Sequence, residues 1–210
     1  LHFAGFSFVD DTDIVQLGYA AEDYGEVAAK LQAALNLWEI GASTSGGLLV
    51  PKKSWYCLVD FNWKDGDWSY NEVMDDAVVT VNDAEGHPQN LVLLPPTEAK
   101  RMLGVYLSAD RKNITQLKEL CKVAEQWREK VRVGSLTRND AWLALISTVL
   151  KKLEYPLLAT TLTEKECKHI MAPILQGGSS KAGICRQMAR ALVHGPKQYK
   201  GLNLHNLYTT

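Results

Sequence analysis

Two adjacent aspartates, Asp10 and Asp11, are the residues whose type and spacing best suit metal chemistry. They follow Phe8-Val9 and lie between two short apolar stretches that are typical of strands. Neighbouring carboxylates at a hairpin tip repel each other, and a divalent cation between them and a phosphate relieves that repulsion. In nucleotidyl transfer such cations activate the attacking 3′-hydroxyl and neutralise the leaving pyrophosphate.

Two other interpretations of this acidic tip are open at this point. The first is a solvated acidic turn, which needs no metal. The second is a metal-dependent hydrolase that uses Asp10, Asp11 and Asp13. A hydrolase of this kind needs a further cluster of histidines or carboxylates, and the sequence has none at ligand spacing.

The first half of the chain is predicted to combine short strands with one helix. A helix is expected from about Tyr24 to Gly41, where apolar residues recur at helical spacing. Asp65-Gly66 is a strong hairpin signal, and a second hairpin is expected around residues 83–88. The remaining strands are expected at residues 3–9, 14–17, 48–50 (ended by Pro51) and 102–107.

The second half is predicted to be helical, because the apolar period changes after Asp110. Three capping boxes indicate where three helices begin, and a fourth helix is expected at about 184–194. The boxes are Asn113-x-x-Gln116, Thr137-x-x-Asp140 and Thr163-x-x-Glu166. The predicted fold class is therefore α+β, with an α+β part at 1–110 and an all-helical part at 111–210.

The charge of the two parts differs sharply. Residues 1–110 hold 6 Lys+Arg and 17 Asp+Glu, whereas residues 111–210 hold 17 Lys+Arg and 7 Asp+Glu. This asymmetry favours an acidic part that attracts metal ions and a basic part that binds a polyanion. Two differently charged solvated surfaces would give the same count.

The lack of recognisable targeting signals and the cysteine usage predict an intracellular protein of the nucleus or cytoplasm, with no membrane partner. No apolar run is long enough to span a bilayer, and the first residues lack the features of a signal peptide. The four cysteines form no C-x-x-C pair, as is typical of reduced thiols.

Four motifs, in order, resemble the reverse transcriptases of retrotransposons without long terminal repeats. The resemblance spans nearly the whole chain. Its motifs are the acidic tetrapeptide at 8–11, the glycine-strand-lysine segment at 46–54, Leu103-Gly104-Val105, and a helical region that ends in Gly195-Pro196 and Gly201-Leu202. The resemblance implies a polymerase palm followed by a thumb, and RNA-directed DNA synthesis with two Mg²⁺ or Mn²⁺ ions.

The resemblance also implies roles for single residues. Asp10 is expected to bind the metal ions, with Asp11 as a second, weaker ligand. Lys53 is expected near the leaving pyrophosphate, where a cationic amine can donate a proton, although a solvent-facing lysine is an equal alternative. Phe8 stands where the family commonly has tyrosine, and it keeps an apolar face for packing against the primer. Leu103, Gly104 and Val105 are expected to contact the primer end, and a simple strand-end turn is the alternative for Gly104.

The basic part would bind an RNA template and a DNA primer along the thumb. Lys118 and Lys122 are four residues apart, as are Arg186 and Arg190, so each pair is expected to share one helical face. Such faces contact phosphates without sequence preference.

In the family that the chain resembles, three features precede the acidic hairpin: a second catalytic aspartate, the segment that shapes the nucleotide pocket, and the fingers. Here only nine residues precede Asp10. We therefore expect this chain to be a fragment that lacks the upstream fingers and palm segment. On its own it is expected to be inactive, with dNTP bound only by the full-length enzyme. The alternative is a non-catalytic, nucleic-acid-binding remnant of a retroelement.

Overall fold

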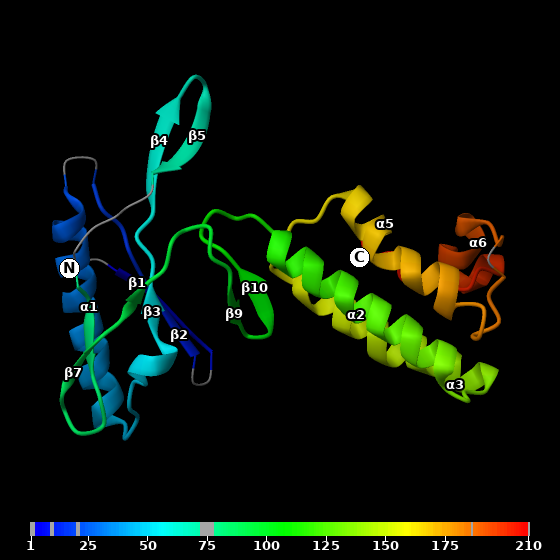
Figure 1. The fold of residues 1–210 in the computed structure, drawn as a ribbon, viewed down its shortest axis with the longest axis horizontal. Coiled ribbons are helices and arrows are strands. Elements are labelled where there is room, and N and C mark those ends of the chain that lie inside the picture. The colour runs from blue at the N-terminus through cyan, green and yellow to red at the C-terminus, as the bar shows by residue number, and fades with distance from the viewer. Residues whose placement is uncertain (1–2, 9–10, 20–21, 72–77, 186, 210) are drawn as a thin grey trace. The chain divides into compact units, whose positions relative to one another are not determined.

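The computed structural model describes residues 3–8, 11–19, 22–71, 78–185 and 187–209 of the chain (Figure 1). It contains short strand pairs and several helices, which confirms the α+β class. The chain divides into two compact units, unit 1 at Leu1–Glu98 and unit 2 at Ala99–Thr210. None of the helices in these described ranges combines the length and the apolar character that crossing a bilayer requires.

Unit 1 begins with an antiparallel hairpin that is backed by a helix. Its strands are β1 (Phe3–Phe8) and β2 (Asp11–Gln16), and the helix is α1 (Tyr24–Thr44). Residues of β2 alternate between exposed and half-buried, as expected for a strand with one covered face. Because α1 packs against β2, this helix gives the hairpin its supporting layer.

A complete capping box starts α1, and the sequence analysis did not identify it. The Asp23 carboxylate accepts a hydrogen bond from the Glu26 backbone N–H at 2.8 Å, and Glu26 accepts one from the Asp23 N–H. The helix ends at Thr44, and Gly46 follows with φ +82°, a conformation that glycine adopts without strain.

Two polar side chains fasten α1 to the strand β6 (Thr80–Asn82). The Gln32 amide donates to the Thr80 carbonyl at 2.9 Å and accepts from its N–H at 2.7 Å. About two turns further along α1, the Glu39 carboxylate accepts hydrogen bonds from the Asn82 backbone N–H at 2.9 Å and from the Asn82 side-chain amide at 3.0 Å. Both side chains therefore take the place of a neighbouring strand.

The other strands of unit 1 form three separate pairs. The predicted turn at Asp65-Gly66 joins β4 (Asp60–Lys64) to β5 (Asp67–Asn71), and the second predicted hairpin joins β6 to β7 (Pro88–Asn90). A parallel pair, β3 (Trp55–Tyr56) with β8 (Val92–Leu93), was not predicted.

The strand predicted at residues 48–50 was wrong. That segment is irregular, and Pro51 opens a short 3₁₀ helix, η1 (Pro51–Lys53). A proline lacks the N–H that a strand ladder needs, and it suits the first turn of a helix. The small core of unit 1 lies elsewhere, around Tyr56, Leu58 and Val79.

Unit 2 starts with a β-hairpin and continues as helices. The hairpin consists of β9 (Lys100–Met102) and β10 (Val105–Leu107). The α-helices are α2 (Ile114–Val133), α3 (Arg138–Ala144), α4 (Leu150–Glu154), α5 (Glu164–Pro173) and α6 (Arg190–His194). Between and after them lie the π-helical segments η2 (Leu145–Val149) and η4 (Ile174–Gly178) and the 3₁₀ segments η3 (Tyr155–Leu158) and η5 (Lys197–Tyr199).

The two units divide before the β9–β10 hairpin, whereas the predicted boundary lay after it. The physical reason is a buried side chain on α2. Gln116 accepts a hydrogen bond from the Tyr106 backbone N–H at 2.7 Å, which holds β10 against this helix. The predicted capping box at Asn113-x-x-Gln116 is therefore wrong, and Asn113 makes no side-chain cap.

The other two predicted boxes, at Thr137 and Thr163, are both present and complete. The helices that follow them build one core, in which Leu145, Leu153 and Ile170 are fully buried. Pro173 ends α5, because a proline inside a helix removes a hydrogen-bond donor, and the wider turn η4 follows.

The predicted fourth helix is much shorter than expected. It starts at Arg190 rather than near Ile184, because Ala189 is extended, with ψ 133°. After the helix, Gly195 and Gly201 approach so closely that a Cβ on Gly201 would lie 2.0 Å from the Gly195 carbonyl oxygen. The two glycines of the terminal motif therefore allow the chain to fold back on α6, where Leu202 bonds to Leu192.

A lysine from a distant loop caps the C-terminus of α2. The Lys181 ammonium donates to the Gly134 carbonyl at 2.7 Å and to the Arg132 carbonyl at 3.1 Å. These carbonyls lie at the negative end of the helix dipole and have no partner within the helix. Lys181 thus joins the 179–184 loop to the end of α2.

Replacing this lysine is expected to destabilise unit 2. In Lys181→Met the apolar stem remains and both charge-assisted bonds are lost, so the free energy of unfolding should fall by about 1–2 kcal/mol. Lys168→Met is the matched control, since Lys168 pairs only with exposed Glu164 and should change stability by less than about 0.5 kcal/mol. Urea denaturation followed by helical circular dichroism measures both. Equal effects of the two variants would contradict this role.

Candidate functional site

The acidic hairpin of unit 1 carries the metal ligands predicted from the sequence. Asp11 is the first residue of β2, its side chain is exposed, and its backbone is opposite Phe8 in the register. Asp10 lies outside the described residues. Among the described side chains, none forms a hydrogen bond or ion pair with the Asp11 carboxylate, so its oxygens are accessible to a cation.

Electrostatic repulsion is concentrated on the outer face of β2. Asp11 and Asp13 are two residues apart, so their side chains leave the strand on the same side. Partial desolvation raises the pKa of the Asp13 carboxyl, and the negative charge of Asp11 raises it further. A hard divalent cation, which prefers carboxylate oxygens, would relieve this repulsion. The donor set therefore suits Mg²⁺ or Mn²⁺.

The predicted proton donor, Lys53, is the last residue of η1, and its side chain is exposed. No hydrogen bond or ion pair connects it to Asp11 or to any other described residue. Its backbone N–H bonds to the Val50 carbonyl, which completes the 3₁₀ turn after Pro51. Local backbone structure thus presents the cationic amine of Lys53 to solvent.

The predicted primer-contacting segment forms a tight turn rather than the continuous strand expected at 102–107. Leu103 and Gly104 join β9 to β10 and have φ +47° and +87°. Positive φ at both positions is the signature of a two-residue hairpin turn. Leu103 is half-exposed, and Val105 is buried. Gly104 is therefore explained by the backbone of the turn.

Contacts inside unit 2 hold this turn in place. The Tyr155 hydroxyl donates to the Leu103 carbonyl at 2.8 Å, and a Cβ on Gly104 would lie 3.6 Å from the Tyr155 ring. Gln116 fixes β10 from the other side, as described above. The turn tip is thus supported by side chains from α2 and η3.

A buried carboxylate organises the connection from β10 to α2. Asp110 accepts hydrogen bonds from the Ser108 hydroxyl at 2.6 Å and the Lys112 backbone at 3.0 Å, and the Lys112 ammonium lies 3.4 Å away. Desolvation opposes ionisation, but the bonds from Ser108 and Lys112 outweigh it and lower the pKa of Asp110. This carboxylate sets the angle at which the chain enters α2.

Of the two pairs of side chains predicted to bind phosphate in unit 2, only the lysine pair lies on one helix. Lys118 and Lys122 are both exposed on α2, one helical turn apart. Lys122 lies 3.5 Å from Glu119, whereas Lys118 forms no ion pair with a described residue. Arg190 opens α6, so Arg186 precedes that helix and the predicted shared helical face is wrong. Arg186 itself lies outside the described residues.

The difference in charge between the two units is larger than that between the two parts predicted from the sequence. Unit 1 holds 4 Lys+Arg and 16 Asp+Glu, and unit 2 holds 19 Lys+Arg and 8 Asp+Glu. Several basic side chains of unit 2 pair with acids, as Arg128 does with Glu125 at 2.8 Å. The excess of cations remains large after such pairing, which is the composition of a surface that attracts a polyanion.

A further group of possible metal ligands, which was not predicted from the sequence, lies in the β6–β7 turn. Side-chain ligand atoms of Asp83, Glu85 and His87 all come within 4.8 Å of one another. The Asp83 carboxylate already accepts hydrogen bonds from the backbone of His87 and Glu85 and from the Gln89 amide, which lower its pKa. The structure of the turn accounts for this aspartate without a metal.

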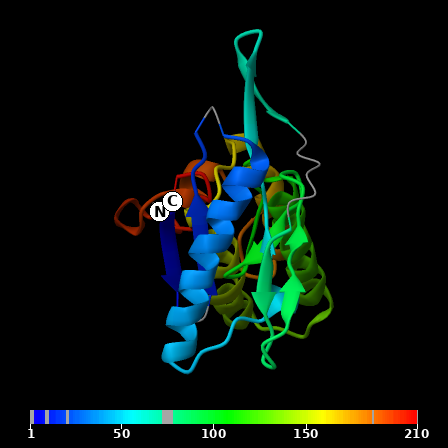
Figure 2. The same cartoon turned by 90° about the vertical axis from the view of Figure 1, so that its left-hand side faces the viewer.

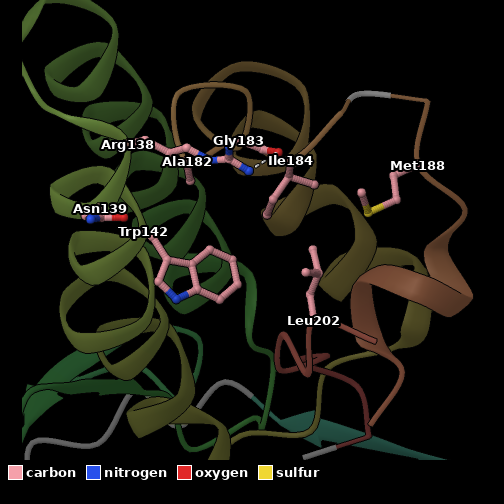
Figure 3. Close-up of a pocket in the computed structure, with 8 residues that line it drawn as sticks. All are labelled: Arg138, Asn139, Trp142, Ala182, Gly183, Ile184, Met188 and Leu202. Atoms are coloured by element: carbon pink, nitrogen blue, oxygen red, sulfur yellow. Dashed lines mark hydrogen bonds between the residues drawn. The ribbon is translucent and has the colours of Figure 1, made fainter. Parts of the chain in front are cut away.

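A hollow of about 270 Å³ in unit 2 was not anticipated from the sequence (Figure 3). Its walls come from the start of α3, from residues 182–184 and Met188, and from the segment after α6. Trp142 and Leu202 line the apolar side, and Arg138 lies against Gly183, whose carbonyl it reaches at 3.4 Å. These residues are far apart in sequence, so no local pattern could have identified them together.

Comparisons with known proteins add no family assignment. No protein-family model matches the chain, and neither the curated proteins nor the solved structures contain a significant match.

Titration of Asp110 is expected to contribute to acid sensitivity. Because its pKa is lowered in the folded state, its contribution to stability is present above the unfolded-state pKa of about 4 and disappears as the pH falls through the folded-state value. Asp110→Asn should cost about 1–3 kcal/mol at pH 7 and progressively less below pH ~4. Urea denaturation at a series of pH values measures the difference. A constant difference across that range would show that the charge of Asp110 is unimportant.

Proposed function

We propose that this chain is the palm-and-thumb portion of a reverse transcriptase of the kind found in retrotransposons without long terminal repeats. In this proposal unit 1 holds the catalytic cations for RNA-directed DNA synthesis, and unit 2 binds the hybrid of RNA template and DNA primer. The incoming dNTP is used by the full-length enzyme.

The observation that carries the proposal is the acidic β1–β2 hairpin. An exposed Asp11 opens β2 directly after the tip, and α1 supports the strand from the other face. The exposed Asp11 supports the proposal that it and its neighbour Asp10 would hold Mg²⁺ ions, which would supply activation of the primer 3′-hydroxyl and neutralise charge on the phosphates. Lys53 would then protonate the leaving pyrophosphate.

The supported turn at Leu103-Gly104 suits the primer-binding role. Positive φ at both residues makes the turn compact, and few side-chain atoms surround Gly104. A rigid turn that is fixed by Gln116 and Tyr155 can position a primer end reproducibly. Phe8 would pack against the same primer.

Binding of Mn²⁺ tests the metal site directly. We expect Mn²⁺ to broaden the backbone NMR signals of residues 8–13 at lower concentration than those of any other segment. Asp10→Asn combined with Asp11→Asn should abolish this broadening, because the remaining ligands are too few. Asp83→Asn is the matched control, since it removes one acid of the β6–β7 turn and should leave the signals of residues 8–13 broadened. If Mn²⁺ broadens the signals of residues 83–87 before those of residues 8–13, the proposal is contradicted.

Binding of a fluorescent RNA–DNA hybrid tests the role of unit 2. The dissociation constant should rise steeply with salt, as phosphate contacts require. Lys118→Ala combined with Lys122→Ala should weaken binding roughly 3- to 10-fold and reduce the salt slope. Lys30→Ala is the control in unit 1, where it removes one lysine that pairs with Glu22, and it should have little effect. Identical affinities of all three proteins would refute a phosphate-binding face on α2.

The two experiments also separate the proposal from a non-catalytic nucleic-acid-binding remnant. Such a remnant would bind the hybrid with the same salt dependence. It would not require Mn²⁺ at residues 8–13, and its affinity would be unchanged by EDTA or by substitution of Asp10.

A further inference from the structure

The β4–β5 hairpin carries aromatic side chains that the core of unit 1 does not use. Phe61 is 51% exposed and Trp63 is 56% exposed. Figures 1 and 2 show the hairpin extending beyond α1 and the other strands of unit 1. At its base the Tyr24 hydroxyl donates to the Asp60 carboxylate at 2.7 Å, which ties the hairpin to α1.

Strand geometry places these aromatic rings on one face. Phe61 and Trp63 are two residues apart on β4, so they leave the strand on the same side. Tyr70 stands opposite Phe61 in the register, and their rings are 4.9 Å apart and tilted by 46°. The Asp65-Gly66 turn has positive φ at both residues, which gives the pair the tight connection that keeps this register.

The hairpin also offers backbone groups to a partner. Within the described part of the chain, β4 and β5 form a sheet of two strands, and no third strand adds to either outer edge. An extended peptide can bind to such an edge through main-chain hydrogen bonds. Exposed aromatic rings beside an open edge are typical of a docking surface.

Charge indicates which kind of partner fits. Asp60, Asp65 and Asp67 lie at the base and the tip of the hairpin, and Lys64 is its single basic residue. The whole of unit 1 is strongly acidic, with 16 Asp+Glu against 4 Lys+Arg. A nucleic-acid strand would be repelled by this surface, whereas a basic polypeptide would be attracted.

We propose that the β4–β5 hairpin binds an extended, arginine-rich polypeptide segment of a partner protein. A guanidinium group stacks on aromatic rings and also pairs with carboxylates, so it uses both features of the hairpin. Alternate residues of an extended peptide are about 6.5–7 Å apart, which matches the spacing of Phe61 and Trp63 along β4. This inference is independent of the polymerase assignment.

Two peptides of equal charge test the proposal. Fluorescein-labelled nona-arginine and nona-lysine are titrated with the full chain at roughly physiological salt, and fluorescence anisotropy gives both dissociation constants. We expect nona-arginine to bind more tightly, because lysine stacks less well on aromatic rings. Phe61→Ser combined with Trp63→Ser leaves the charge unchanged and should weaken nona-arginine binding roughly 5- to 30-fold.

The matched control changes the other face of the same hairpin. Asn62→Ala combined with Ser69→Ala should alter the affinity less than about two-fold, because these side chains lie away from the aromatic face. Equal affinities for the two peptides, or no effect of the aromatic substitutions, would show simple attraction between opposite charges and overturn the proposal.

A measurement on the unmodified chain covers the case in which the aromatic variant unfolds. Hydrogen exchange at residues 60–71 should slow when nona-arginine is added, and exchange at residues 80–90 in the neighbouring hairpin should not change. Protection at residues 60–71 by a single-stranded dT oligonucleotide instead would assign the aromatic face to nucleobases and overturn the polypeptide proposal.

Discussion

Repulsion between the carboxylates of one short hairpin is the physical constraint on which the proposed metal site of unit 1 depends. Asp11 and Asp13 leave β2 on the same side, and the pKa of Asp13 is raised by partial burial and then by the charge of Asp11. A strand cannot separate these charges, because alternate residues always share a face. The opposite face of β2 packs on α1, so the acids remain directed outward. A cation is the simplest partner that would neutralise them.

Polar side chains that bond to distant backbone groups hold each unit together. Gln32 and Glu39 complete the edge of β6, Gln116 completes that of β10, and Lys181 caps the end of α2. Each bond satisfies a backbone group that would otherwise lack a partner. These contacts decide which segments belong together, and Gln116 is the reason that the β9–β10 hairpin belongs to the helical unit.

The same chain thus joins an acidic unit to a basic one, and the proposals use that difference in two ways. The proposals assign cations to the β1–β2 hairpin and arginines to the β4–β5 hairpin of unit 1, although the first need only oxygen ligands and the second also need aromatic rings. Phosphates are assigned by the same reasoning to unit 2. A hybrid that binds basic helices while its primer end approaches metal ions is consistent with polymerase chemistry.

The sequence by itself determined the features that depend on neighbours along the chain. These are the helical period of α1 to α5, the boxes at Thr137 and Thr163, and the Asp65-Gly66 turn. It also identified the acidic tip and the charge difference between the halves. Each of these depends on residues within about one or two turns of each other, whose preferences act before the chain is folded.

Only the tertiary structure decided the features that depend on distant partners. Gln116 was interpreted as part of a cap because its partner, the Tyr106 N–H, belongs to a strand that the sequence does not place beside α2. The parallel pairing of β3 with β8, the short α6 and the hollow beside Trp142 likewise need segments that meet only after folding. The physical reason is that hydrogen bonds and packing between remote segments override weak local propensity.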